Sequence, residues 1–140
     1  MDGYWFKSSK FDIEPGEDKE IKPGMYGRQL ARWLKQRLEE KGYTVEDIVN
    51  EERGRCLMCS REPFMLWVGC GNMINPQGVG EESILPSKEK IVWRCFVAAE
   101  VPHFTRYFRK VDTGSAVSKL YSTLGEILLK EPTVIFVEEP

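Results

Sequence analysis

The sequence predicts an α+β protein, in which a mostly antiparallel sheet of five or six strands has two amphipathic helices packed on one face. Two stretches show helical periodicity, and several short β-prone runs follow one another between them. The links between those runs suit hairpins better than crossover connections. Consecutive strands between helices favour the α+β class. We expect one domain of 140 residues in the order strand, helix, four strands, helix, strand.

The first strand is expected at residues 4–13, which are rich in aromatic and β-prone side chains. Residues 14–24 follow, and their prolines, glycines and charges indicate a surface connection. Carboxylates in this region could bind calcium or a basic partner, although they lack the regular spacing and central glycine of a calcium loop. The favoured interpretation is a solubilising loop. The carboxylates concerned are Asp12, Glu14, Glu17, Asp18 and Glu20.

The first helix is predicted between Pro23 and Gly42. Apolar residues recur there at steps of three and four, which is the spacing of one helix face. Pro23 suits the first turn of a helix, and Gly42 suits a left-handed stop. The apolar stripe consists of Tyr26, Leu30, Trp33, Leu34 and Leu38.

Three β-prone runs come next. Residues 43–50 are consistent with a short strand, which could form an edge of the sheet. Residues 55–60 and 64–69 are apolar runs around a short loop, which predicts a hairpin. If residues 60–63 close this hairpin, Cys59 pairs with the first residue of the second run.

After the hairpin, Gly69 and Gly71 are expected to let the chain bend out of the sheet. A long loop is expected at about residues 71–89, which lack periodicity, and loops of this length are usually functional or mobile. Residues 90–101 then predict a long central strand covered on both faces, because both alternating sets of side chains are apolar.

The last part of the chain predicts a helix and a strand. Residues 103–111 mix aromatic and basic side chains, and their period does not decide between a strand and an irregular segment. Residues 115–131 carry one apolar stripe, and Pro132 ends the helix. Residues 133–137 are strongly β-prone and predict the last strand. The candidates for the helix cap are Asp112, Thr113 and Ser115.

Bulk properties restrict the classes of function. The net charge of -2 provides no general attraction to nucleic acid, so nucleic-acid binding is disfavoured. No stretch reaches the roughly 20 apolar residues of a membrane span, and the N-terminus lacks a secretory pattern. We therefore expect a cytoplasmic protein without a membrane segment, whose four cysteines are reduced. No cofactor is predicted.

The cysteines allow two interpretations. Cys56 and Cys59 have the spacing of a zinc half-site, which Cys70 and Cys95 could complete. The flanking apolar residues instead indicate an extended strand, on which Cys56 and Cys59 point to opposite faces. In the expected hairpin, Cys70 lies about 20 Å from Cys59, at ~3.3 Å per residue. The favoured interpretation is four buried hydrophobic thiols and no metal site.

Two groups of residues are candidates for a protein-contact surface. Arg28, Arg32 and Lys35 lie on one face of the first predicted helix and form a basic stripe. A second group interleaves aromatic and basic side chains, a combination that anchors many interfaces. It consists of Phe104, Arg106, Tyr107 and Arg109. The four tryptophans are expected to be mostly buried anchors, namely Trp5, Trp33, Trp67 and Trp93.

The sequence therefore favours a small, non-catalytic protein-interaction module of an adaptor, chaperone-like or inhibitor type, with a protein partner. The alternative is a cysteine-dependent enzyme or zinc-binding module that uses Cys56, Cys59, Cys70 or Cys95. Tightly held zinc or a fast-reacting thiol would favour that alternative.

Overall fold

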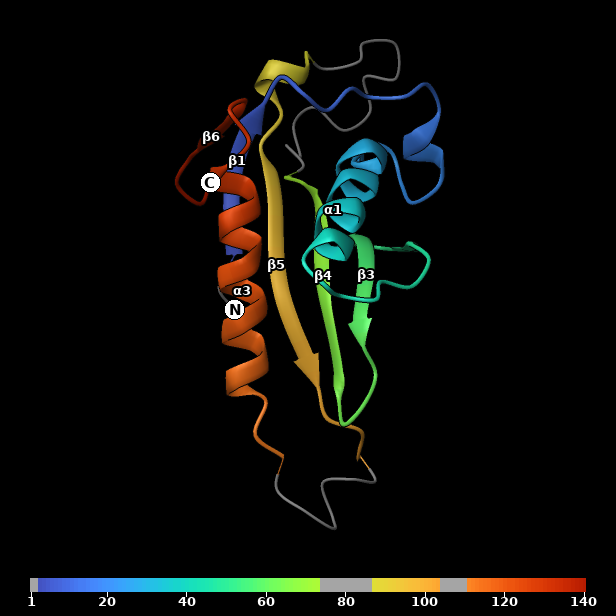
Figure 1. The fold of residues 1–140 in the computed structure, drawn as a ribbon. Helices are drawn as coiled ribbons and strands as arrows, with labels where there is room; N and C mark the ends of the chain where they lie inside the picture. Colours follow the sequence, from blue (N-terminus) through green and yellow to red (C-terminus); the bar gives the residue numbers. More distant parts are fainter. Residues whose placement is uncertain (1–2, 74–86, 104–110) are drawn as a thin grey trace.

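The computed structural model of the chain describes residues 3–73, 87–103 and 111–140. Its helices and strands follow the predicted order (Figure 1). They are β1 (Gly3–Ser8), the 3-10 turn η1 (Glu17–Lys19), α1 (Arg28–Glu40), β2 (Val49–Glu51), β3 (Gly54–Ser60), β4 (Met65–Asn72), the 3-10 turn η2 (Lys88–Lys90), β5 (Trp93–Glu100), α3 (Gly114–Leu129) and β6 (Val134–Phe136).

The strands form one six-stranded sheet in the order β2-β3-β4-β5-β1-β6. Each neighbouring pair in it is antiparallel. Both helices lie on the same side of the sheet, with α1 over β3 and β4 and α3 over β5 (Figure 1). The predicted fold class and the packing of both helices on one face are confirmed.

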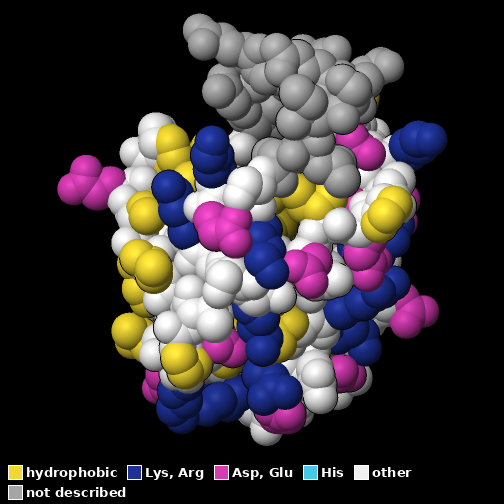
Figure 2. Space-filling view, turned by 90° about the horizontal axis from the view of Figure 1, so that it is seen from above, with side chains coloured by type: hydrophobic (Ala, Val, Ile, Leu, Met, Phe, Trp, Pro, Cys, Tyr) yellow, Lys and Arg dark blue, Asp and Glu magenta, His cyan; other side chains and the backbone are white. Residues whose placement is uncertain are grey.

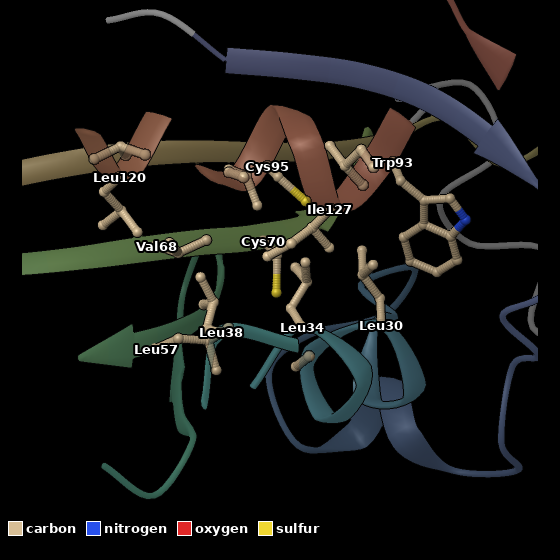
Figure 3. Packing of buried hydrophobic residues seen from close by; sticks show 14 of the residues in the cluster. Leu30, Leu34, Leu38, Leu57, Val68, Cys70, Trp93, Cys95, Leu120 and Ile127 are labelled. Atoms are coloured by element: carbon tan, nitrogen blue, oxygen red, sulfur yellow. The ribbon is translucent and has the colours of Figure 1, made fainter. Parts of the chain in front are cut away.

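The hydrophobic core fills the space between the helices and the sheet (Figure 3). Alternate residues of β5 point into it, because successive side chains of a strand face opposite sides. Leu34 of α1 and Leu124 of α3 are fully buried there. Further core residues are Leu30, Leu38, Leu57, Val68, Cys70, Trp93, Cys95, Leu120, Ile127 and Leu128.

Helix α1 begins at Arg28, so the predicted start at Pro23 is wrong. Pro23 belongs to a turn that precedes the helix, in which the Met25 amide donates a hydrogen bond to the Lys22 carbonyl. Gly27 adopts φ 120° at the N-cap, a conformation that favours glycine. The predicted stop is confirmed at the other end, since Gly42 has φ 100° just after the helix.

The first strand is shorter than predicted. β1 ends at Ser8, and the chain then leaves the sheet so that the fully buried Phe11 packs between two tryptophans. Its ring centroid lies 5.3 Å from that of Trp33 and 6.2 Å from that of Trp93. Phe11 therefore owes its burial to the core beneath α1, which an alternating strand pattern does not reveal.

The hairpin of β3 and β4 is confirmed, but its register differs from the predicted one. Ser60 pairs with Leu66, and an irregularity between Met58 and Ser60 shifts the pairing, so Cys59 does not pair with the residue after Pro63. Irregularities of this kind, like β-bulges, come from one extra residue in a strand and are hard to detect in a sequence.

The predicted bend at the hairpin exit is wrong, because Gly69 and Gly71 remain inside β4, which continues to Asn72. The long loop therefore begins later than predicted. Its last residues form η2, and residues 74–86 lie outside the described part of the chain.

The predicted second helix and last strand are confirmed as α3 and β6. Thr113 is the N-cap residue of α3, and its side chain forms no capping hydrogen bond. The Asp112 carboxylate, one residue earlier, accepts a hydrogen bond of 2.9 Å from the Gly114 amide. None of the helices in the described ranges has the length and hydropathy of a membrane span.

Candidate functional site

One face of the sheet packs on the helices, and no described helix or strand covers the other face. On β5 this second face carries Arg94 and Phe96, which are partly buried, the small buried Ala98, and the exposed Glu100. The prediction that β5 is covered on both faces is therefore wrong for the part of the chain that the structure describes. We call this surface the open face; it comprises Trp5, Lys7, Val49, Met58, Met65, Trp67, Arg94, Phe96, Ala98, Glu100 and Ile135.

The open face is predominantly apolar. Val49 on the β2 edge is 52% exposed and Ile135 on the β6 edge is 66% exposed. Between these edges, Trp5, Trp67 and Phe96 are each only partly buried. Of the four tryptophans that the sequence suggested as anchors, only Trp93 is fully buried.

A glycine makes room for the aromatic centre of this face. Gly69 pairs directly with Phe96 across β4 and β5. A Cβ atom at Gly69 would lie 2.3 Å from the phenyl ring, so the ring lies over the bare backbone of the neighbouring strand. An aromatic residue that covers a cross-strand glycine supports strand register. Gly69 therefore fixes the position of Phe96 and does not bend the chain.

Arg94 lies against this aromatic surface. Its guanidinium carbon is 4.5 Å from the centroid of Phe96 and 5.8 Å from that of Trp5, within the range of cation–π contacts. Within the described residues it forms no ion pair, and its buried Nε atom, like Trp5 Nε1, has no hydrogen-bond partner. Partly or fully buried Arg28, Arg37 and Arg55, in contrast, each pair with a carboxylate.

A shallow hollow lies beside Phe96 and Trp67, next to Gly69 and Cys56. About 30 Å³ of it is enclosed, which is room for a water-sized group, and Glu51 and Arg53 also line it. The aromatic rings beside the hollow therefore provide the contact area of this face. The open face thus combines the features of a protein-contact surface.

The predicted basic stripe on α1 is paired within the chain. Arg28 Nη1 lies 2.8 Å from Glu14 Oε1, and its other terminal nitrogen pairs with Glu20. Arg32 Nη1 lies 3.5 Å from Glu14 Oε2, and Lys35 Nζ lies 3.3 Å from a carboxylate of its own helix. Charged side chains mix at this end of the molecule, with no large field of one sign (Figure 2). The stripe as a partner-binding surface stays a prediction.

The carboxylates of the acidic segment have a structural role that the sequence did not indicate. Glu17 is fully buried, and its Oε1 accepts hydrogen bonds of 2.7 Å from the Gly27 amide and 3.2 Å from the Arg28 amide. Its Oε2 accepts a third, of 2.6 Å, from the Glu14 amide. An anion at this position satisfies the free amides and the dipole of the helix start. Glu17 also favours the charged form of Arg55, whose pKa burial lowers.

The second predicted contact group cannot be placed. Phe104, Arg106, Tyr107 and Arg109 lie outside the described residues. The open face, which replaces them as the best-defined candidate, was missed because its residues come from all six strands, which lie far apart in sequence. The alternation of Arg94, Phe96 and Ala98 in β5 was the one available signal.

The four cysteines are buried free thiols. Cys59 belongs to the core, whereas Cys56 lines the hollow on the opposite face. Cys70 and Cys95 pair across β4 and β5, a proximity that the sequence did not reveal, and both lie on the core side (Figure 3). Among the residues that the structure describes, no three potential metal ligands come together.

Burial disfavours the thiolate form of these cysteines. It raises the pKa of Cys56 to about 11, and it raises the pKa of Cys59 and of Cys70 to about 12. Burial also raises the pKa of Cys95 well above its ordinary value. Nucleophilic and metal-binding cysteines need the opposite shift, because the thiolate is the reactive form. These thiols therefore act as small apolar groups at neutral pH.

Comparisons with known proteins give this chain no relative: no family model, no curated protein and no solved structure matches it.

Proposed function

We propose that this chain is a non-catalytic protein-interaction module that binds its partner through the open face. The observation that carries the proposal is the group of Trp5, Trp67, Phe96 and Arg94, which lies on a sheet face opposite the core. Tryptophan and arginine are the residues that most often dominate binding energy at protein interfaces. Large exposed apolar patches on a soluble domain commonly mark contact sites.

A role as an adaptor, chaperone-like factor or inhibitor is compatible with such a surface. The four free cysteines suit a reducing compartment, which supports the expected cytoplasmic location. The raised thiol pKa values make the alternative, a cysteine-dependent enzyme or zinc module, the weaker proposal.

Affinity capture tests this proposal. The tagged chain and its Trp67→Ser variant are expressed in the native cell, and co-purified proteins are quantified by mass spectrometry. We expect a stoichiometric partner with the unchanged chain and its loss with the variant, because the indole supplies contact area at the centre of the open face. Leu129→Ser is the control, since Leu129 is 73% exposed on α3, outside that face.

The proposal fails if the Trp67→Ser variant recovers the same proteins in the same amounts as the unchanged chain and the open face also does not mediate self-association. A salt titration with single-stranded RNA and DNA provides the second comparison, because aromatic sheet faces can also stack bases. Tight binding that weakens steeply with salt would replace a protein partner by a nucleic acid.

A further inference from the structure

We infer that the partner of the open face is a second copy of this chain, joined by a two-fold axis that crosses β5 at Val97. This inference rests on the proposed function, because it names the occupant of the same surface. Its basis is the arrangement of charges and of large and small side chains along β4 and β5. This arrangement on one copy is complementary to the same arrangement on a second copy turned around.

Two unpaired opposite charges lie at symmetric positions on β5. Arg94 precedes Val97 by three residues and Glu100 follows it by three, and both side chains lie on the open face. Neither forms an ion pair within the described part of the chain, and Glu100 is exposed. A two-fold axis at right angles to the strand at Val97 therefore places Arg94 of each copy over Glu100 of the other. Isologous contacts require this kind of self-complementary pairing.

The same axis matches large side chains with small ones. Phe96 of one copy comes to lie over Ala98 of the other, because these residues flank Val97. Val97 pairs with Val68 of β4, so Trp67 comes to lie over Gly69 of the second copy. The Phe96 ring covers Gly69 in each copy, and each indole thus meets a phenyl ring. Aromatic contacts of this kind stabilise interface centres.

The geometry of sheet packing accommodates this arrangement. Aligned sheets cross at about 30°, and three residues of a strand span about 10 Å, so each charge is displaced sideways by about 5 Å. The flexible arginine and glutamate side chains can bridge that displacement. Lys7, which lies on the same face beyond Trp5, falls outside the overlap of the two β5 strands.

The available area indicates a weak dimer. β4 and β5 each contain eight residues. With this axis β1 lies wholly on one side of Val97 and does not overlap its symmetry mate, so β3, β4 and β5 provide the contact. Three strands at ~4.8 Å spacing and ~27 Å length give about 390 Å² per copy, or about 780 Å² in total. That area lies below the range of stable specific interfaces, so we expect a dissociation constant on the order of 100 µM.

Sedimentation velocity on the full chain, from about 1 to about 500 µM, tests this inference across the expected dissociation constant. We expect the unchanged chain to shift from monomer to dimer over this range. Arg94→Glu and Glu100→Arg should each weaken self-association by at least about tenfold, because like charges then face each other twice. Lys7→Glu makes the same charge change as Arg94→Glu outside the overlap and should leave the dimer unchanged.

Mixing the two single variants provides the sharpest measurement. In a mixed dimer, each glutamate at position 94 or 100 of one variant faces an arginine of the other variant. The Arg94→Glu and Glu100→Arg chains should therefore associate with each other more tightly than either does with itself. Circular dichroism confirms that both variants fold, and Glu100→Arg changes an exposed side chain only. An interface in which positions 94 and 100 do not meet predicts no such recovery.

Two results would overturn the inference: a monomeric chain at about 500 µM, or single variants that dimerise like the unchanged chain. If partner capture from cells nevertheless depends on Trp67, the proposed function stands and its partner is a different protein. If neither self-association nor capture depends on the open face, both proposals fail.

Discussion

The two faces of this sheet come from the same strands but have different surroundings. On one face, Trp93 and Cys95 of β5 point into the core beneath the helices and are fully buried. On the other, Arg94 and Phe96 form a partly exposed surface that no element in the described ranges covers. Two alternating apolar sets on one strand therefore do not show that both faces are buried within a single chain. The second set can serve a contact between chains.

The start of α1 and the open face also differ in how their charged side chains are paired. At the start of α1, buried Glu17 and the pairs of Arg28 with Glu14 and Glu20 hold basic and acidic groups together. On the open face, Arg94 rests on aromatic rings without a carboxylate. Paired charges of the first kind position an element, whereas an unpaired cation on an apolar surface remains available to a partner.

The largest expected effect on stability comes from the core face. Leu34→Ala should lower the free energy of unfolding by about 3 kcal/mol, because it removes a fully buried side chain and leaves a cavity under α1. Urea denaturation followed by far-ultraviolet circular dichroism measures the change. A loss below about 1 kcal/mol would mean that α1 does not pack on the sheet as described.

A smaller loss is expected at the charged junction. Glu17→Gln should destabilise the chain by about 2 kcal/mol, since three backbone amides lose their charged acceptor in a buried site. The matched control, Asp12→Asn, removes an exposed carboxylate that pairs with Lys88 and should cost no more than about 0.5 kcal/mol. Equal effects of the two substitutions would contradict the capping role of Glu17.

The buried thiols predict a loss of stability at alkaline pH. The folded chain keeps the protons of Cys59 and Cys70 to a pKa of about 12, whereas in the unfolded chain they leave near the ordinary value of 9.0. Unfolding thus releases protons above pH 9, so the contribution of these groups is constant below that pH and falls as the pH rises toward 12.

Urea midpoints at a series of alkaline pH values measure this effect, and Cys70→Ala should reduce the slope. Thiol titration of the folded chain at pH 8 should be slow for all four cysteines, because burial keeps them protonated. A fast-reacting thiol under native conditions would revive the enzymatic alternative.

The smallest effect on stability is expected on the open face. Trp67→Ser should lower the free energy of unfolding by about 1 kcal/mol or less, because the indole is only partly buried, yet it should abolish partner binding. Denaturation and affinity capture on the same variant compare the two quantities. A large loss of stability together with unchanged binding would assign Trp67 to the fold and not to an interface.

The sequence allowed the fold to be predicted because its signals are local. The stripe that includes Leu30, Leu34 and Leu38 defines α1, and Pro132 marks the end of α3. The helix start was predicted too early because it depends on Glu17. The carboxylate of Glu17 accepts a hydrogen bond from the amide of Gly27, which lies ten residues later in the chain. Contacts of that kind have no periodic signature.

The candidate site was less predictable for the same physical reason. Arg28 and Arg32 were selected by their helical spacing, which cannot show that Glu14 already pairs with both. Trp5 and Trp67 come to the same face only through a sheet register that includes an irregularity in β3. The site arises from strand order and register, and neither can be derived from the spacing of residues.

The central claim is that the open face contacts a protein while the opposite face holds the fold. Hydroxyl-radical footprinting tests this most directly. It compares the pure chain in dilute solution with the chain in an extract of its native cells. We expect Trp67 and Met58 to be oxidised in the dilute chain and protected in the extract, with exposed Leu129 modified equally in both. Equal oxidation of Trp67 and Met58 in the two samples would contradict the claim.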